Sequence, residues 1–325
     1  MLIRPRRNRT SPFIRDLVAE TTLTPQDFVW PLFVVEGSNV KDEISSLPGV
    51  YRRSVDQIIA CLPEAIDLGI RAVALFPAVA ESKKDSMATE SCNPEALNQQ
   101  CVRAIKEQFP QLAVVTDVAM DPYSSDGHDG IVRNGKIVND QSLEVLASMA
   151  LVQAQAGADI VACSDMMDGR VQAIREKLDQ NGFEDVLICS YCIKYASAFY
   201  GPFRDALDSA PKFGDKKTYQ MDPRNSLEGL REIQLDEIEG ADILMVKPGL
   251  PYLDVIRMTS ENTSLPVAAY HVSGELSMLK AASINGWLDY DSCLMESLTA
   301  IKRAGAKLIF TYAAVDASKI IAAKS

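Results

Sequence analysis

Lys247 and Lys194 are the two residues of this sequence whose type and position best suit covalent chemistry. Lys247 ends the apolar run at residues 241–246, just before Pro248 and Gly249, and Lys194 ends the run at residues 186–193. An ammonium beside so much apolar surface loses hydration, which lowers its pKa and makes a neutral amine available to attack a carbonyl. If the two runs form neighbouring strands, each ammonium also lowers the pKa of the other. The alternative is that a lysine at a strand end simply reaches solvent.

Further polar residues follow the ends of other apolar runs. If these runs are parallel strands of one barrel, their carboxyl ends form a single rim, which is where such enzymes hold their active site. Any one of these residues could be a structural cap, but their convergence on one rim predicts a site. They are Asp117, Asp121, Asp126, Asp129, Ser164, Asp165, His271, Ser273 and Tyr312.

A long segment without clear periodicity follows Lys194. Residues 195–223 are rich in aromatic residues, glycine and basic residues, and a loop this long inside a compact domain is usually functional. We expect this segment, called the lid below, to cover the rim. Its Arg204 and Lys216 suit a substrate carboxylate, and the guanidinium of Arg204 offers a fork of donors.

The elements that must position these residues alternate along the chain. Amphipathic, helix-like stretches separate the apolar runs, and Gly69, Gly157, Gly240 and Gly305 each end such a stretch just before an apolar run. This alternation predicts a TIM (β/α)8 barrel in an α/β domain at residues 25–325. The alternative, a doubly wound sheet, would need two domains, and no linker is evident. The eight runs lie at residues 28–35, 72–78, 113–120, 159–163, 186–193, 243–246, 266–270 and 308–312.

The composition excludes several classes of protein. The net charge of −11 argues against a nucleic-acid partner, which requires a basic surface. No apolar run is long enough to span a membrane, and the N-terminus lacks the apolar segment of a signal peptide, so we expect a cytoplasmic protein. The seven scattered cysteines are typical of reduced thiols. We expect Cys189 and Cys192 to be core residues, despite their CxxC spacing.

Residues 1–24 stand apart from this pattern. They combine four closely spaced arginines with an apolar stripe at Phe13, Ile14, Leu17 and Val18. One interpretation is a disordered basic tail. The other is an oligomerisation arm that leaves its own barrel and buries the stripe on a neighbouring subunit.

Several long motifs, in order along the chain, resemble the 5-aminolevulinate dehydratase family, also called porphobilinogen synthase. These are KYASAFYGPFRDA around Lys194, MVKPGLPYLDVI around Lys247, SDMMDGRV, YHVSGE and IKRAGAKLIFTY. The resemblance runs from the arginine-rich arm to Tyr312. It implies a TIM barrel, usually a homo-octamer whose N-terminal arms embrace neighbours. It also implies a lyase that condenses two 5-aminolevulinate molecules to porphobilinogen, with loss of two waters, early in haem and chlorophyll biosynthesis.

The resemblance also implies roles for individual residues. Lys247 would form a Schiff base with the first substrate and Lys194 with the second. A protonated imine is an electron sink that acidifies the neighbouring C–H, so a carbon nucleophile can form at neutral pH. Holding both carboxylates would orient the coupling. The carboxylate ligands would be Ser273 and Tyr312 for the first substrate, and Arg204 and Lys216 for the second.

The metal ligands depart from those of the zinc-dependent members. Those members carry three cysteines where this sequence has Ala119, Asp121 and Asp129. Oxygen donors favour Mg²⁺ or a monovalent cation over zinc, as in the aspartate-rich type of plants, algae and some bacteria. The spacing does not fit an EF-hand. The resemblance places an allosteric Mg²⁺ at Glu232, and it implies no organic cofactor. His128 and His271, the only histidines, are expected to be hydrogen-bonded rim residues.

Two other functions remain open on the sequence. A class I aldolase would share the barrel and one Schiff-base lysine, but would not require the second lysine or the paired carboxylate ligands. A non-catalytic binding barrel, such as a metabolite sensor, would keep those ligands and could lose either lysine. The compartment is also open, since a plant or alga would place the enzyme in the plastid.

Overall fold

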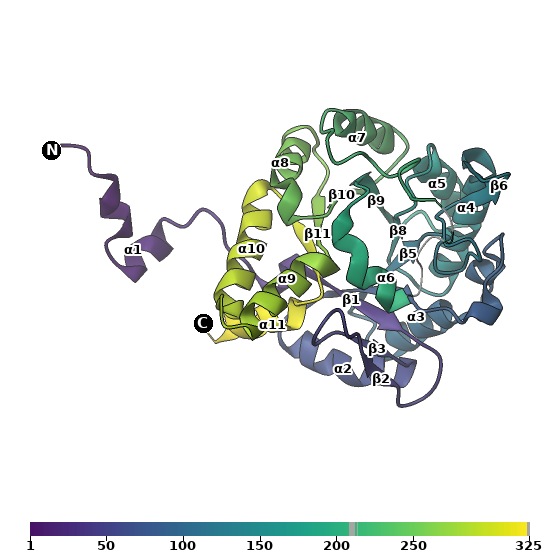
Figure 1. Cartoon of the computed structure of the whole chain (residues 1–325), viewed down its shortest axis with the longest axis horizontal. Coiled ribbons are helices and arrows are strands. Elements are labelled where there is room, and N and C mark those ends of the chain that lie inside the picture. The colour runs from purple at the N-terminus through teal and green to yellow at the C-terminus, as the bar shows by residue number, and fades with distance from the viewer. Residues whose placement is uncertain (208–211, 213, 324–325) are drawn as a thin grey trace.

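The computed structural model describes residues 1–207, 212 and 214–323. Eight parallel strands form a closed barrel, in which each strand pairs with the next and β12 pairs with β1 (Figure 1). The predicted TIM barrel is therefore confirmed, and the alternative of a doubly wound sheet is wrong. The barrel strands are β1 (Phe28–Val34), β4 (Ala72–Pro77), β5 (Ala113–Val118), β8 (Ile160–Cys163), β9 (Leu187–Lys194), β10 (Ile243–Lys247), β11 (Val267–His271) and β12 (Leu308–Thr311).

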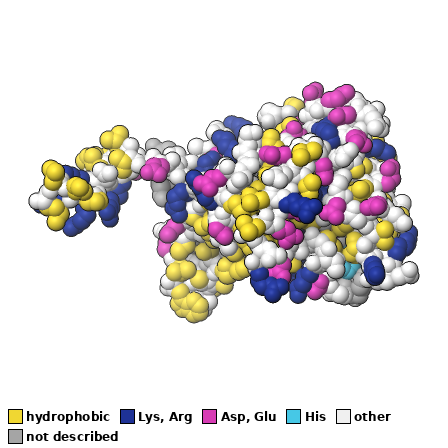
Figure 2. All heavy atoms as spheres, turned by 90° about the horizontal axis from the view of Figure 1, so that it is seen from above, with side chains coloured by type: hydrophobic (Ala, Val, Ile, Leu, Met, Phe, Trp, Pro, Cys, Tyr) yellow, Lys and Arg dark blue, Asp and Glu magenta, His cyan; other side chains and the backbone are white. Residues whose placement is uncertain are grey.

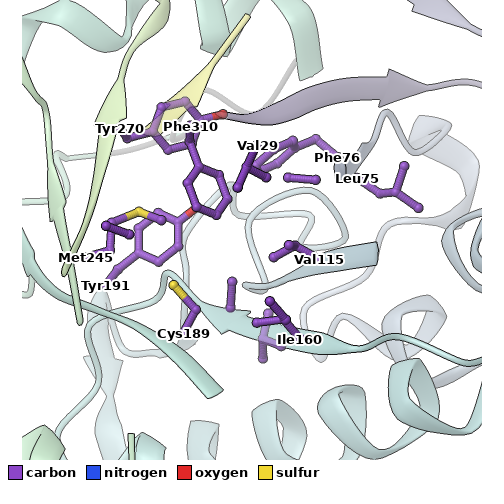
Figure 3. Close-up of a cluster of buried hydrophobic side chains, with 14 of the residues drawn as sticks. Val29, Leu75, Phe76, Val115, Ile160, Cys189, Tyr191, Met245, Tyr270 and Phe310 are labelled. Carbon is purple, nitrogen blue, oxygen red and sulfur yellow. The ribbon is translucent and has the colours of Figure 1, made fainter. Parts of the chain in front are cut away.

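The strands are apolar on both faces because both faces are covered. Every residue of β1, β8, β10 and β11 is buried. One face packs on the surrounding helices, and the other fills the barrel interior, where Figure 3 shows side chains from all eight strands converging. Burial on both faces is the reason that the strands appear in the sequence as continuous apolar runs.

Amphipathic helices surround the barrel (Figure 1). The glycines at 69, 157, 240 and 305 all have positive φ, as expected for residues that end a helix and turn the chain into a strand. Gly305 is doubly constrained, because a Cβ there would also lie 2.3 Å from Oγ of Ser260. The outer helices are α2 (Val55–Asp67), α3 (Leu97–Gln108), α4 (Asn139–Gln155), α5 (Arg170–Asp179), α7 (Glu228–Ile238), α8 (Leu253–Glu261), α9 (Ser273–Ile284), α10 (Tyr290–Ala304) and α11 (Ala314–Ala322).

Several short elements lie outside the barrel strands and the outer helices, and they were not predicted. The ribbon of β2 (Lys41–Glu43) and β3 (Tyr51–Arg53) extends the sheet beside β1, and β6 (Ile131–Arg133) pairs with β7 (Lys136–Val138). The lid contains a helix, α6 (Gly201–Leu207), preceded by the 3₁₀ turn η5 (Ala198–Tyr200). The remaining 3₁₀ turns are η1 (Pro5–Arg9), η2 (Pro25–Asp27), η3 (Glu81–Lys83), η4 (Thr89–Cys92) and η6 (Leu250–Tyr252).

The N-terminal segment extends away from the barrel (Figure 1). It contains η1 and the helix α1 (Pro12–Leu17), which pack against each other. Phe13 and Leu17 are 72% and 80% exposed, and Figure 2 shows hydrophobic and basic side chains gathered on this arm. The segment is therefore helical rather than featureless, and its predicted role in oligomerisation stays a prediction.

Two further expectations concern the whole chain. All seven cysteines are free thiols, and Cys189 and Cys192 are buried on β9 as predicted. Within the described ranges, no helix combines the length and the apolar character that crossing a membrane requires.

Candidate active site

Lys194 and Lys247 lie side by side at the carboxyl ends of adjacent strands. They are direct partners in the parallel register of β9 and β10, and each side chain is only 6% exposed. The sequence predicted that both lysines end apolar runs, and the pairing of those runs now places the two amines at one mouth of the barrel.

Aromatic rings surround the Lys247 ammonium. Its Nζ lies 4.3 Å from the ring centre of Tyr270, 5.1 Å from those of Tyr191 and Phe203, and 5.4 Å from that of Tyr200. Burial in this setting, together with repulsion from Lys194, lowers the pKa of Lys247 to about 7, although nearby carboxylates oppose the shift. Near neutral pH a large fraction of this amine is therefore uncharged and nucleophilic.

Lys194 and Asp117 are charged neighbours of Lys247 at the barrel mouth. The Lys194 ammonium donates a short hydrogen bond to the carbonyl of Ser164, which follows β8. Asp117, near the end of β5, has one carboxylate oxygen without a hydrogen-bond partner in the described structure. Burial raises the pKa of Asp117, while a hydrogen bond from Ser164 and the charges of both lysines oppose that shift. The sequence placed Asp117 on the rim but gave it no role, and Tyr191 was missed because its strand appears only as core.

Lys216 forms an ion cluster with Asp121 and Asp129. Its Nζ lies 2.9 Å from Oδ2 of Asp121 and 3.2 Å from Oδ2 of Asp129, and all three side chains are buried. Burial and repulsion by Asp129 raise the pKa of Asp121 to about 7. Burial acts in the same direction on Asp129, but the Lys216 and Lys194 ammonium groups outweigh it and hold the Asp129 pKa at about 2. Lys216, which was predicted to bind substrate, thus lies in one cluster with Asp121 and Asp129, which were predicted to bind a cation.

The other predicted carboxylate ligands lie under or on the lid. Oγ of Ser273, at the start of α9, accepts a hydrogen bond of 3.0 Å from the backbone N–H of Phe203. The hydroxyl of Tyr312 accepts one of 3.1 Å from Tyr270, whose ring contacts the Lys247 ammonium. Arg204 lies on α6 and is partly buried, and it forms no ion pair with residues 1–207, 212 or 214–323.

Glu275 links the segments that follow β10 and β11. This buried carboxylate accepts hydrogen bonds from the backbone N–H groups of Leu250 and Val272, both 2.6 Å, and of Gly249, 3.4 Å. Burial raises its pKa to about 7, against the effect of these donors. Glu275 therefore fixes the turn after Lys247 relative to Ser273, a role that sequence patterns could not reveal because its partners are backbone groups.

Glu232 lies on α7, outside the ring of strands. It lines a cavity of about 960 Å³ together with Asp168, Asp222 and Glu228. Burial raises the pKa of Glu232 to about 7, although the nearby Arg170 guanidinium opposes the shift. Neither Lys194 nor Lys247 lines this cavity, whereas the lid residues Lys217, Tyr219 and Asp222 do.

The histidines are hydrogen-bonded, as expected. Nδ1 of His128 lies 3.1 Å from the hydroxyl of Tyr219, and Nδ1 of His271 lies 3.1 Å from Oγ1 of Thr311. Burial lowers the pKa of His271 to about 4, so it stays neutral. Among the residues with described positions, no group of three or more His, Cys, Asp or Glu side chains could enclose a metal ion.

A parallel barrel with two buried lysine amines at its carboxyl-terminal mouth defines a class of enzyme suited to form imines with carbonyl compounds. Comparison with known proteins identifies the family. The sequence matches the family described as Delta-aminolevulinic acid dehydratase over residues 2–320. The chain therefore belongs to the delta-aminolevulinic acid dehydratase family, and it is a hydro-lyase of tetrapyrrole biosynthesis.

Individual relatives support this assignment. The Delta-aminolevulinic acid dehydratase of Bradyrhizobium diazoefficiens is 54% identical over 98% of this chain and 91% of its own. The chloroplastic enzyme of Physcomitrium patens is 53% identical over 100% of this chain and 75% of its own. The crystal structure of delta-aminolevulinic acid dehydratase (porphobilinogen synthase) from Toxoplasma gondii ME49, in complex with the reaction product porphobilinogen, is 50% identical. Its TM-score is 0.96, with 98% of this chain and 91% of that chain covered. The class I aldolase and the non-catalytic barrel are thereby excluded.

Proposed function

We propose that Lys247 and Lys194 form the two Schiff bases through which two 5-aminolevulinate molecules condense to porphobilinogen. The observation that carries this proposal is the register pairing of the two lysines, with the Lys247 pKa lowered to about 7. Each imine forms with loss of one water from a substrate carbonyl and a lysine amine. Protonated, it withdraws electrons from the adjacent carbon, so that a C–H proton can be removed near neutral pH.

Four residues would orient the two substrates. Ser273 and Tyr312 would hold the carboxylate of the first substrate, and Arg204 and Lys216 that of the second. Burial of Ser273 and Tyr312 beside the rings around Lys247 supports the first pair. For the second pair, Arg204 has a free guanidinium in the described structure, whereas Lys216 would have to exchange Asp121 and Asp129 for the substrate. Fixing both carboxylates turns a bimolecular coupling into an oriented one.

The donor atoms present favour Mg²⁺, or a monovalent cation, over zinc. Asp121 and Asp129 offer only oxygen, which suits hard cations, and the Lys216 ammonium already pairs with both of them. A cation at this pair would therefore require Lys216 to leave. Glu232 fits an allosteric Mg²⁺, because that ion needs only one protein carboxylate when it keeps most of its water, and the adjoining cavity has room for that water. We infer an aspartate-rich, magnesium-type enzyme that uses no organic cofactor.

We further propose that the protein is a homo-octamer in which residues 1–24 serve as the oligomerisation arm and residues 25–325 form the catalytic domain. The exposed apolar side chains of α1, on an arm that points away from the barrel, support this division (Figure 2). The enzyme would act in the cytoplasm, or in the plastid if its source is a plant or alga, on a small-molecule substrate and without nucleic acid.

Replacement of each lysine by arginine tests the proposed chemistry. Lys247→Arg and Lys194→Arg keep the charge but remove the nucleophilic amine, so porphobilinogen formation should fall by orders of magnitude while folding survives. Lys319→Arg, at a surface ion pair with Glu64, is the matched control and should retain full activity. Near-normal turnover in either active-site variant would exclude that lysine as a Schiff-base residue.

A further inference from the structure

Arg52 connects the ribbon beside β1 to the lid. From β3, its Nε donates to the carbonyl of Ala206 and its Nη2 to that of Asp205, both at 2.6 Å. These carbonyls belong to the last described residues of α6. The guanidinium therefore attaches α6 to β3 with two charge-assisted hydrogen bonds, and it joins segments more than 150 residues apart.

The opposite end of the same lid segment rests on α9. The backbone N–H of Phe203 donates to Oγ of Ser273, and a Cβ at Gly274 would lie 2.5 Å from the carbonyl of Phe199, so the two backbones touch. The helix α6 is thus attached to the barrel at its start by α9 and at its end by Arg52. Figure 1 shows it crossing in front of the strands.

This attachment matters because α6 and η5 supply part of the aromatic enclosure of Lys247. Phe203 packs against Phe33 and Phe76, with ring centres 5.8 and 5.5 Å apart, and its ring lies 5.1 Å from the Lys247 ammonium. Tyr200 adds a second ring and donates a hydrogen bond to the Lys247 carbonyl. Without α6 in place, water would reach the ammonium from this side.

We infer that Arg52 is a positioning residue for the reaction: it holds α6 against the barrel mouth and so keeps water away from Lys247. Arg52 does not touch the lysine, and its effect passes through the lid helix. The inference rests on the proposed role of Lys247 as a Schiff-base residue. It assigns a function to the β2–β3 ribbon, which is otherwise an accessory to the barrel.

Most of the other groups that face Lys247 lie on elements to which Arg52 donates no hydrogen bond. Lys194 faces it from β9, and Asp117, Asp121 and Asp129 face it from β5 and the segment after it. Three hydroxyl groups complete its surroundings, those of Tyr191, Tyr200 and Tyr270. Only Tyr200 belongs to the lid segment, so a change in the behaviour of Lys247 after removal of Arg52 reports on solvent access from the lid.

Amide hydrogen exchange tests the attachment itself. In Arg52→Ala, exchange in α6 should accelerate by about tenfold or more, because the two hydrogen bonds that attach this helix to β3 are lost. Arg53→Ala is the matched control, since Arg53 is the next residue on β3 and stacks over Trp30 and Tyr51 instead. Exchange in α6 that is equal in the two variants and the wild type would overturn the inference.

The pH dependence of adduct formation tests the consequence for Lys247. The enzyme is mixed with 5-aminolevulinate, reduced with borohydride, and the Lys247 peptide quantified across pH. In Arg52→Ala the midpoint should move up from about 7 by about one unit, so the initial rate at pH 7 falls about fivefold and recovers near pH 9. Simple misfolding would not be rescued by raising the pH, and Arg52→Lys should show a smaller shift.

Different results would refute the Schiff base at Lys247 and the positioning role of Arg52. No Lys247 adduct in the wild-type enzyme would refute the proposed Schiff base, and the exchange experiment would then decide the role of Arg52. A wild-type adduct with the same pH midpoint in Arg52→Ala and Arg53→Ala would overturn the role of Arg52 and leave the Schiff base intact.

Discussion

Lys216→Met should lower the free energy of unfolding, because it leaves two buried carboxylates without their ammonium partner. Asp121 and Asp129 are 9% and 1% exposed and share the Lys216 ammonium. Breaking a buried ion pair on one side costs about 3–5 kcal/mol, because the remaining charge can be neither solvated nor paired. Methionine keeps much of the side-chain length, so the loss reports on charge rather than on packing.

The sign of the pH dependence follows from the two states of Asp129. In the wild type its pKa of about 2 lies below the ordinary value of 3.8, so its pairing stabilises the fold above that value. In the variant the Lys216 charge no longer opposes burial, although Lys194 still does, so the Asp129 pKa rises. Where it exceeds the ordinary value, the folded state retains a proton that the unfolded state loses. The destabilisation should therefore grow with pH, by at most about 1.4 kcal/mol per pH unit, or about 2.7 kcal/mol between pH 5.5 and 7.5.

Urea unfolding of Lys216→Met at these two pH values is the assay. Lys217→Met is the control, because Lys217 is 72% exposed and its pair with Asp215 should contribute less than about 1 kcal/mol. Added Mg²⁺ or K⁺ should restore part of the loss if a cation can take the place of the ammonium. A pH-independent loss, or one no larger than that of the control, would refute the ion-cluster account.

The remaining predictions concern the stability of the barrel, Mg²⁺ binding and assembly. Arg170→Met should destabilise the fold by about 3–5 kcal/mol in urea, because it leaves the buried Asp236 carboxylate, 2.9 Å away, unpaired; an unchanged midpoint would contradict this. Binding of Mg²⁺, followed by titration calorimetry, should strengthen as pH rises through about 7, where Glu232 ionises, and should vanish in Glu232→Ala; binding that persists in the variant would place the ion elsewhere. Deleting residues 1–24 should reduce the mass measured by light scattering, and an unchanged oligomer would argue against the arm.

The fold was largely predictable because its strands are buried on both faces. Each barrel strand coincides with a predicted apolar run to within two residues at either end. Gly240 and Gly305 also marked the helix ends correctly. The ribbon of β2 and β3 was not predictable, because its strands are only three residues long and largely polar. The residues of β2 are exposed and those of β3 partly buried, and β3 pairs with β1 through backbone groups that leave no periodic signal.

The site was predictable at strand ends and less so elsewhere. Lys194 and Lys247 stood out because each ends an apolar run, and neighbouring runs then had to pair. The contact of Lys216 with Asp121 spans 95 residues of chain, so no local pattern could reveal it. Glu275 and Arg52 act on backbone groups, which every residue carries. Such partners become visible only once the chain is folded.

Borohydride trapping tests the central claim most directly. The enzyme is incubated with 5-aminolevulinate, reduced, digested and mapped by mass spectrometry. We expect the label on Lys247 first, because its amine is largely neutral near pH 7 inside its aromatic enclosure, and on Lys194 at higher substrate concentration. A label found mainly on Lys194 would contradict the order of binding, and a label on neither lysine would contradict the Schiff-base mechanism.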